Sequence, residues 1–397
     1  MVMPHYLDYA ATSAIRPRSV GDAVARFLHE VGGTPGRGAH GPALEAGRLA
    51  LRCRLSVQRL LGLPGDPGRI AFMANATLGL NTALYGLLDP GDVLVVTAYD
   101  HNSVLRPAAW LERAQGVEVR MIPGTPDGGI DYHRAEELLE GARVLTVNSA
   151  SNVLGNRLPL KELADRAHAA GALVVLDAAQ GAGHLPLRCA DEGADLVAFT
   201  GHKGMLGPQG TGGIWVREGV EVRPLIRGGT GGDSRLREMP DAMPDRLEAG
   251  TVNAPGLAGL ETGIAEVLGR GVESLHGRES LLKARLRDGL SSIPGVRVLS
   301  PPAPDGVGIV TLAVDGMDPG RMAHRLEAEF GVQGRAGLHC APECHRLLGS
   351  LDTGALRLSL GWASDEGDVD AAVEGVAALA AEARTSVASG PVHGGGS

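Results

Sequence analysis

The chain has 397 residues, of which 44% are hydrophobic, and its mean hydropathy is +0.02. These values fit one large or two medium domains with a buried core. Lys and Arg number 37 against 46 Asp and Glu, which gives a formal net charge of −9. Because no stretch gathers enough Lys or Arg to form a basic stripe, nucleic acid is not an expected partner.

The first residues of the chain show no basic region followed by an apolar stretch, so no signal peptide is indicated. No apolar run approaches the roughly 20 residues that span a bilayer. We therefore expect a cytoplasmic protein with no membrane partner. The four cysteines are too few and too scattered for a disulfide framework, and one is a candidate reactive thiol: Cys53, Cys189, Cys340 and Cys344.

Short apolar runs alternate with segments of helical spacing in the first half of the chain. The runs, bounded by Gly, Pro or Asp, cover residues 69–73, 92–96, 117–122, 143–147, 172–176 and 196–199. The helical segments between them cover residues 78–88, 104–114, 132–139 and 160–170. Strands that are apolar throughout and alternate with helices predict an α/β architecture, with a mostly parallel sheet covered on both faces.

The pattern changes after about residue 255. A long helical stretch is followed by strands, a helix, another strand and an alanine-rich helix, at residues 256–290, 296–299, 308–314, 319–330, 355–360 and 369–383. We interpret this part as a smaller α+β domain. The predicted division is a large domain over residues 15–255, a small domain over 1–14 and 256–383, and a disordered tail over 384–397.

Lys203 lies in a glycine-rich turn just after a buried strand, in the segment Ala198-Phe199-Thr200-Gly201-His202-Lys203-Gly204. A lysine there can form a Schiff base if desolvation or a neighbouring cation keeps its amine unprotonated. A solvated loop lysine is the commoner interpretation of these residues alone. Asp177 follows the run 172–176, at the strand end where open α/β sheets bind ligands. It fits a protonated pyridine nitrogen as partner, or else a helix N-cap.

Two further segments follow strands. In Ala74-Asn75-Ala76-Thr77-Leu78-Gly79 a strand ends and a helix begins, and free backbone N–H groups beside a Thr hydroxyl can bind phosphate. Any capped helix has a similar sequence, so the segment is weak evidence alone. His101 follows the run 92–96 and can lie flat on an aromatic cofactor, although a lone histidine is more often structural.

Together and in this order, these segments resemble the fold type I pyridoxal-phosphate enzymes, and specifically the class V aminotransferase and cysteine desulfurase family. The resemblance begins at Tyr6-Leu7-Asp8-Tyr9-Ala10-Ala11-Thr12 and extends to the last helix. It implies pyridoxal 5'-phosphate as cofactor, with a Schiff base at Lys203, a partner for the pyridine nitrogen in Asp177, and a stacking ring in His101.

The same resemblance assigns the remaining cofactor contacts. Gln180 and Asn152 would hydrogen-bond the 3′ oxygen of the ring. Four residues would hold the phosphate: Ala76, Thr77, Thr200 and His202. The segment Glu248-Ala249-Gly250-Thr251-Val252-Asn253 is similar to a family strand that gives its threonine to the phosphate of the partner subunit, so Thr251 implies a homodimer.

The segment Arg335-Ala336-Gly337-Leu338-His339-Cys340-Ala341-Pro342 is similar to the cysteine loop of the group II desulfurases, a branch that includes selenocysteine lyases. Cys340 would be the nucleophile that accepts sulfur, and positive charge from Arg335, His339 and His345 would favour its thiolate. The alternative for Cys340 is a small buried residue.

Substrate contacts follow from the same resemblance. Arg357 matches the family arginine that clamps the α-carboxylate, a role that suits a planar fork. Arg335 and Asn152 are further candidate substrate-binding residues.

The expected activity is conversion of L-cysteine, or a related sulfur or selenium amino acid, to L-alanine with transfer of sulfur to Cys340 as a persulfide. A sulfur-acceptor protein is then an expected partner. Alternatives on the same scaffold are a C–S lyase acting by elimination, a selenocysteine lyase and an epimerase, and a non-catalytic sulfur-relay scaffold is a different class. Asp100 in place of a longer Glu, and the sequence Ala-Asn-Ala-Thr at the phosphate turn, indicate a divergent subfamily.

Cys344 lies four residues after Cys340 and is a possible second thiol for the persulfide. Cys340, Cys344 and His345 can also be interpreted as partial metal ligands. Because their spacing is not a usual zinc pattern and no fourth ligand beyond His339 is evident, no metal is expected.

Overall fold

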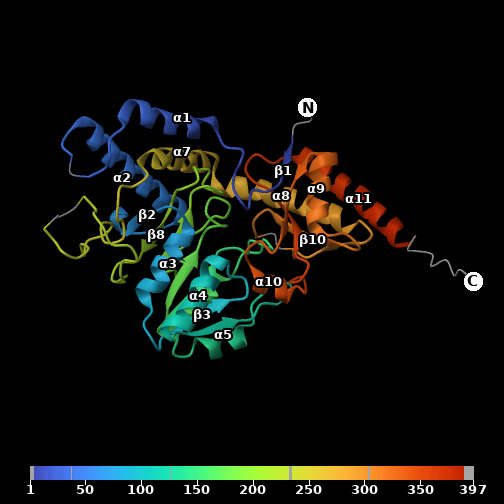
Figure 1. Cartoon of the computed structure of the whole chain (residues 1–397), viewed down its shortest axis with the longest axis horizontal. Coiled ribbons are helices and arrows are strands. Elements are labelled where there is room, and N and C mark those ends of the chain that lie inside the picture. Colours follow the sequence, from blue (N-terminus) through green and yellow to red (C-terminus); the bar gives the residue numbers. More distant parts are fainter. Residues whose placement is uncertain (1–3, 37, 126, 232–234, 303–304, 389–397) are drawn as a thin grey trace, which may run out of the picture.

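The computed structural model describes residues 4–36, 38–125, 127–231, 235–302 and 305–388 (Figure 1). Its larger sheet has seven strands in the order β2-β8-β7-β6-β5-β3-β4. The strands are β2 (Ile70–Met73), β3 (Val93–Thr97), β4 (Glu118–Ile122), β5 (Val144–Asn148), β6 (Leu173–Asp177), β7 (Leu196–Thr200) and β8 (Gly212–Val216). The run from β4 to β7 is parallel, whereas β8 is antiparallel to both β7 and β2.

Both faces of this sheet are buried, because successive side chains point to opposite faces and both sets are apolar. In β3, Val93 and Val95 belong to one hydrophobic cluster, and Leu94 and Val96 to another. Two helices, α3 (Ala76–Leu87) and α4 (Asn102–Gln115), supply the second cluster. The first cluster is supplied by α2 (Gly41–Leu61), α5 (Tyr132–Leu139), α6 (Leu160–Ala169) and α7 (Ala254–Arg270). The predicted mostly parallel α/β sheet is therefore confirmed.

A second, smaller unit of sheet and helices follows in the chain. Its antiparallel sheet has the order β12-β13-β10-β9, formed by β9 (Val296–Val298), β10 (Ile309–Val314), β12 (Arg335–Gly337) and β13 (Ala355–Ser359). The helices α8 (Val272–Ser291), α9 (Pro319–Phe330) and α11 (Glu366–Ala388) pack on it around a third apolar cluster. The short α10 (Pro342–Leu347) connects β12 to β13.

The amino terminus joins this second unit. Strand β1 (His5–Tyr6) pairs in parallel with β11 (Val332–Gln333), and Figure 1 shows it beside α9 and α11. The next helix, α1 (Arg18–Arg26), continues into a π-helical turn over Phe27–Val31 and packs on α7. A 3₁₀ turn at Pro67–Arg69 precedes β2.

Several elements differ from the sequence-based expectation. The predicted helix over residues 256–290 is two helices, because Gly271 between them has φ +82° and glycine adopts this conformation readily. Helices α1, α2 and α10 and strands β1, β8, β11 and β12 were not predicted. Helix α11 continues past residue 383 to Ala388, and the rest of the predicted tail, 389–397, lies outside the described residues. The domain boundaries stay a prediction.

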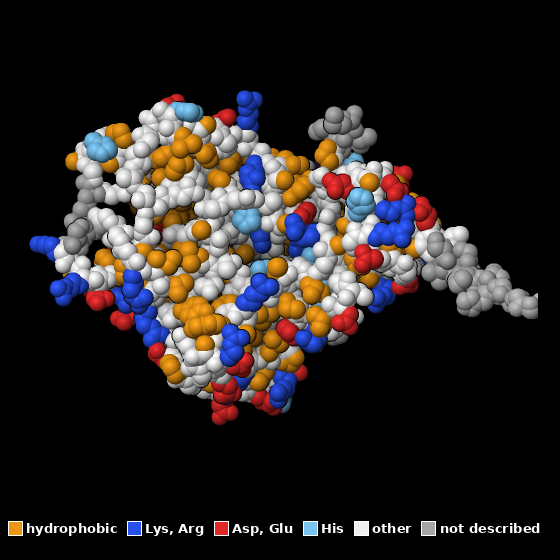
Figure 2. All heavy atoms as spheres, in the orientation of Figure 1, with side chains coloured by type: hydrophobic (Ala, Val, Ile, Leu, Met, Phe, Trp, Pro, Cys, Tyr) orange, Lys and Arg blue, Asp and Glu red, His pale blue; other side chains and the backbone are white. Residues whose placement is uncertain are grey.

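The surface mixes charges of both signs. On the face shown in Figure 2, acidic and basic side chains are interspersed with apolar ones. Among the helices that the structure describes, none combines the length and apolar character needed to cross a membrane.

Gly213 tests the tight packing at the centre of β8. A Cβ there would lie 2.4 Å from the carbonyl oxygen of Ala71 and 2.7 Å from the ring of Phe199. We expect Gly213→Ala to lower the free energy of unfolding by about 1–3 kcal/mol through overpacking. The matched control is Gly47→Ala in α2, where a Cβ meets nothing within 4 Å and where we expect a gain of about 0.5–1 kcal/mol. Urea unfolding measures both, and equal values for the two variants would contradict the packing.

Candidate active site

A pocket lies at the carboxyl edge of the larger sheet, where β5 ends at Asn148, β6 at Asp177 and β7 at Thr200. Parallel strands all present their carboxyl ends at one edge, so residues distant in sequence meet there. Twelve of the predicted site residues line this pocket: Ala76, Thr77, His101, Asn152, Asp177, Gln180, Thr200, His202, Lys203, Arg335, Cys340 and Arg357. Thr251 does not, and instead lines a second cavity together with Met73 and Ala74.

Lys203 and Asp177 form the electrostatic centre of the pocket. Burial lowers the pKa of Lys203 to about 8, against the opposing effect of Asp177. Burial also raises the pKa of Asp177, although its Oδ1 accepts a hydrogen bond from Ala179 N at 2.9 Å. A lowered amine pKa is what a Schiff-base lysine requires.

His101 is neutral and its tautomer is set by its neighbour. Burial, followed by the charge of Lys203, lowers the pKa of His101 to about 4. Its Nδ1 accepts a hydrogen bond from Ser103 N at 3.0 Å, so the proton lies on Nε2. The Ser103 hydroxyl also bonds Thr77 Oγ1 at 2.8 Å. His101 is thereby tied to the first turn of α3.

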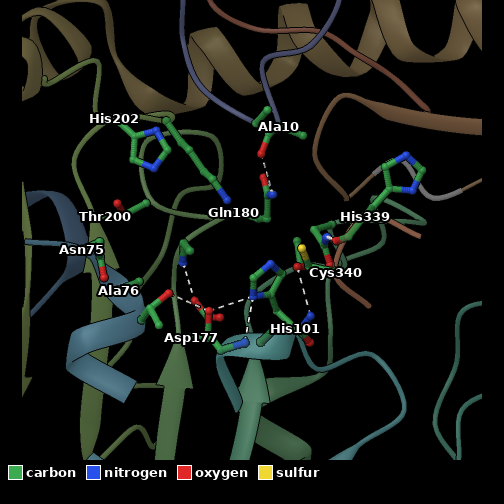
Figure 3. Close-up of a pocket in the computed structure, with 18 of the residues that line it drawn as sticks. Ala10, Asn75, Ala76, His101, Asp177, Gln180, Thr200, His202, His339 and Cys340 are labelled. Carbon is green, nitrogen blue, oxygen red and sulfur yellow. Dashed lines mark hydrogen bonds between the residues drawn. The ribbon is translucent and has the colours of Figure 1, made fainter. Parts of the chain in front are cut away.

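One end of the pocket is rich in uncommitted donors. In α3 the N-cap Asn75 accepts from Leu78 N at 3.0 Å, which leaves the N–H groups of Ala76 and Thr77 without an intrahelical acceptor. The hydroxyl of Thr200 is buried with no hydrogen-bond partner among the described residues. Figure 3 shows Asn75, Ala76, Thr200 and His202 on one side of the pocket and Cys340 on the other. The donor-rich end suits an anion.

An arginine pair marks the part of the pocket formed by the second sheet. Arg357 is buried on β13, and it donates to Asn152 O at 2.9 Å and to Asp8 Oδ1 at 3.2 Å. Its Nε is buried without an acceptor among the described residues. Arg335 also binds Asp8, from Nε and from one terminal nitrogen, at 3.0 and 2.8 Å. Asp8 lies in the quoted Tyr6 to Thr12 segment, but sequence reasoning gave it no role.

Two predicted ring contacts have protein partners in this structure. Gln180 Nε2 donates to Ala10 O at 3.0 Å. Asn152 Nδ2 donates to His339 O at 2.5 Å, while its Oδ1 is buried with no partner among the described residues. Both side chains line the pocket, and Asn152 keeps its Oδ1 uncommitted there.

Cys340 is exposed, whereas Cys53, Cys189 and Cys344 are buried. Burial raises the pKa of Cys344 to about 12, which makes it a poor second thiol. The expectation that His339 and His345 supply positive charge is wrong, because burial lowers their pKa values to about 3 and about 4. Cations at the pocket come instead from Arg335, Arg357 and, when protonated, Lys203.

A lysine of lowered pKa and a buried carboxylate line one pocket at the carboxyl edge of a mostly parallel sheet, and this arrangement fits a fold type I pyridoxal-phosphate enzyme. The chain belongs to the class V aminotransferase family, whose model matches residues 5–372. It is similar to a probable cysteine desulfurase from Methanothermobacter thermautotrophicus, at 34% identity covering 88% of each chain. It is also similar to a cysteine desulfurase from Haloferax volcanii, at 32% identity covering 87% of this chain and 82% of the other.

A solved structure gives the same result. The apo structure of a cysteine desulfurase from Thermococcus onnurineus superposes with a TM-score of 0.88 and 31% identity, covering 95% of this chain and 94% of the other. Members of this family depend on pyridoxal 5'-phosphate.

The residues present fit that cofactor. The unpartnered Thr200 hydroxyl and the free N–H groups of Ala76 and Thr77 can hold its phosphate. Buried Asp177 is a suitable partner for a protonated ring nitrogen. Lys203 lies on the same pocket to bind the aldehyde carbon.

Covalent capture of the cofactor tests Lys203, one of only three lysines in the chain. We expect borohydride reduction to fix pyridoxal phosphate to the wild-type protein and to Lys161→Ala, but not to Lys203→Ala. Lys161 is a surface residue paired with Asp165, which makes it a matched control. Because the amine must be unprotonated, the rate of capture by apoprotein should rise as pH increases through about 8. Peptide mass spectrometry identifies the labelled lysine, and label on another lysine would contradict the assignment.

Proposed function

We propose that the chain is a pyridoxal-phosphate-dependent cysteine desulfurase, which converts L-cysteine to L-alanine and retains the sulfur on Cys340 as a persulfide. The observation that carries the proposal is the presence of an exposed thiol, Cys340, on the same pocket as Lys203 and Arg357. Its similarity to proteins named cysteine desulfurase supports it.

Arg357 is the proposed receptor for the substrate carboxylate. Its buried Nε has no acceptor among the described residues, and a buried donor without an acceptor is costly. A carboxylate that bonds Nε would remove that cost and add a charge-assisted hydrogen bond. Asp8 holds the neighbouring nitrogen of Arg357 at 3.2 Å and fixes the orientation of the guanidinium.

Lys203 is the proposed base for the Cα proton of the substrate. Burial keeps a fraction of its amine unprotonated near neutral pH, because its pKa is about 8. Bound pyridoxal phosphate supplies the electron-accepting ring that makes this proton acidic. His101, neutral with its proton on Nε2, borders the same space and can donate a hydrogen bond there.

Cys340 is the proposed sulfur acceptor. Its thiolate attacks the sulfur of the substrate, a new S–S bond forms, and the bond between Cβ and sulfur breaks. The electron pair of the broken bond stays on the carbon skeleton, which is protonated and leaves as alanine. The balance is cysteine plus protein thiol giving alanine plus protein persulfide, so no external oxidant or reductant is needed.

An eliminating C–S lyase is the second candidate. It would use Lys203 and Arg357 in the same way and release pyruvate, ammonia and sulfide, with no need for Cys340. Cys340 lines the pocket, and Asn102 N donates a hydrogen bond to its carbonyl oxygen at 2.7 Å. A thiol held on the pocket favours the desulfurase, because the lyase reaction does not use it. A selenocysteine lyase would use the same residues as the desulfurase.

A product assay separates these candidates. We expect wild-type protein with L-cysteine and a reductant to form alanine and sulfide, and Cys340→Ala to lose that activity while it retains bound cofactor. Cys189→Ala, which removes a buried thiol outside the pocket, is the control and should retain activity. Pyruvate that persists in Cys340→Ala would establish a lyase instead.

We also propose a homodimer and a sulfur-acceptor protein as partners, and the cytoplasm as location, where thiols such as that of Cys340 are kept reduced. Thr251 supports the homodimer. The family resemblance assigns it a contact with a cofactor phosphate, but within one chain it lines a different cavity from Lys203. A contact with the cofactor of a partner subunit would account for both facts. A persulfide on exposed Cys340 supports the acceptor, since a second protein can reach it.

Solution mass tests the dimer. We expect light scattering to give about twice the chain mass of 40.9 kDa. Thr251→Ala should weaken cofactor retention if its hydroxyl reaches the partner's phosphate site. A monomer that retains full activity would contradict both the homodimer and the proposed role of Thr251.

A further inference from the structure

The loop that carries Cys340 has an unusual backbone. His339 and Cys340 have φ values of +50° and +57°, in the left-handed region, and they are consecutive. Residues with a Cβ enter this region only at an energetic cost, because the Cβ lies too close to the following carbonyl oxygen. Surrounding contacts must therefore hold the pair in place.

Two of these contacts hold the backbone carbonyls. Asn102 N donates to Cys340 O at 2.7 Å, and Asn152 Nδ2 donates to His339 O at 2.5 Å. Asn102 begins α4 and Asn152 lies in the loop after β5, so both donors come from the unit that contains the larger sheet. They fix the carbonyls of the pair, but they do not fix the His339 side chain.

A chain of three side-chain hydrogen bonds fixes that side chain. His339 Nε2 lies 3.2 Å from Arg335 O, His339 Nδ1 lies 3.3 Å from His345 Nε2, and His345 Nδ1 lies 2.8 Å from the hydroxyl of Ser350. The two rings are stacked with their centroids 5.4 Å apart. All three side chains are buried, with His345 at 0% exposure.

The direction of every bond in the chain follows from its first acceptor. Arg335 O is a carbonyl, so His339 Nε2 must donate the proton. Burial lowers the pKa values of both histidines well below neutral, so each carries a single ring proton. His339 Nδ1 is therefore an acceptor and His345 Nε2 donates to it. His345 Nδ1 is in turn an acceptor, and the Ser350 hydroxyl donates to it.

This series of three hydrogen bonds cannot act as a proton relay to the Cys340 thiol. It ends on a backbone carbonyl, which does not take up a proton, and both nitrogens of His339 are committed. Figure 3 shows the His339 ring directed away from the other labelled side chains of the pocket. These hydrogen bonds connect Arg335 with Ser350 beyond α10, so the two ends of the segment that contains Cys340 are held together.

We propose that His345 and Ser350 are positioning residues, which act through His339 to hold Cys340 in the left-handed conformation from which its thiol accepts sulfur. The inference rests on the proposed function for the identity of the reaction. The positioning itself does not require cysteine as substrate.

Variants at both positions test the proposal in the holoenzyme. His345→Leu removes the donor to His339 while it fills the buried space, whereas His345→Gln retains a side-chain N–H donor in reach. Ser350→Ala removes the terminal hydroxyl and Ser350→Thr retains it. Ser300→Ala is the matched control, since its buried hydroxyl accepts from Thr311 N at 2.9 Å outside the pocket.

We expect His345→Leu and Ser350→Ala to lower kcat for alanine formation by about tenfold or more, because small misplacements of a reacting group are costly. KM for cysteine should stay within about twofold, because the carboxylate receptor on Arg357 is unchanged. His345→Gln and Ser350→Thr should restore most of kcat. An equal loss in Ser300→Ala, or unchanged kcat in both His345→Leu and Ser350→Ala, would overturn the proposal.

Alkylation of Cys340 by iodoacetamide supplies a readout that does not depend on turnover. A released loop should let the reagent approach the thiol more freely, so we expect the rate to rise by about threefold or more in His345→Leu and Ser350→Ala. The rate in Ser300→Ala should equal that of wild type. If wild-type protein forms no alanine, the proposed function fails and the alkylation rates still decide the positioning; equal rates in wild type and both variants would refute it.

Discussion

Burial of an amine and a carboxylate on one pocket is the constraint on which the site depends. Desolvation lowers the pKa of the Lys203 amine to about 8, and desolvation also raises the pKa of the Asp177 carboxyl. The cost of burying the Lys203 amine and the Asp177 carboxylate is reduced because their opposite charges interact. It is reduced further when the pocket admits a ligand whose charges complement those of the pocket. The larger sheet, covered on both faces, leaves its carboxyl edge as the place where such groups can gather.

The pocket draws on both sheets, so their relative placement matters to the chemistry. The larger sheet supplies Lys203 and Asp177, and the second sheet supplies Arg357 and the Cys340 loop. A buried contact joins the two units: Glu279 on α8 accepts from Gly308 N at 2.5 Å and bonds His184 Nδ1 at 2.8 Å. A Cβ on Gly204, next to Lys203, would lie 2.5 Å from the His184 ring. The lysine turn is thus packed directly against this link.

The larger sheet was predictable because β3, β5, β6 and β7 are apolar apart from Thr146 and the last residue of each strand, and are bounded by turn residues. Strand β8 was missed because Gly212 and Gly213 look like a loop, whereas their missing side chains are what let β8 pack against Phe199 and Ala71. Helix α2 was missed although its buried residues follow helical spacing, since the exposed leucines Leu44, Leu51 and Leu55 obscure the boundary of its apolar face.

At the site, the residue types and their order in the sequence were enough to predict most of the residues that line the pocket. The carboxyl-edge rule and the family resemblance both act on local segments. What they could not supply were contacts between distant segments, such as Asp8 with Arg357, or Asn152 with the carbonyl of His339. The neutral state of His339 and His345 was also not predicted, because it depends mainly on their burial, which the sequence does not show.

The pairing of β1 with β11 has a consequence for the order in which the molecule is completed. During synthesis His5 and Tyr6 emerge long before their partners, Val332 and Gln333. Strand β1 must therefore remain without its partner until Val332 and Gln333 have been made, and a pairing of such long range is slow to form. Asp8 lies two residues after that strand, so the corner that orients Arg335 and Arg357 cannot form before those arginines have been made. A nascent chain can therefore form the part of the pocket that contains Lys203 before Arg335 and Arg357 are available to bind a carboxylate.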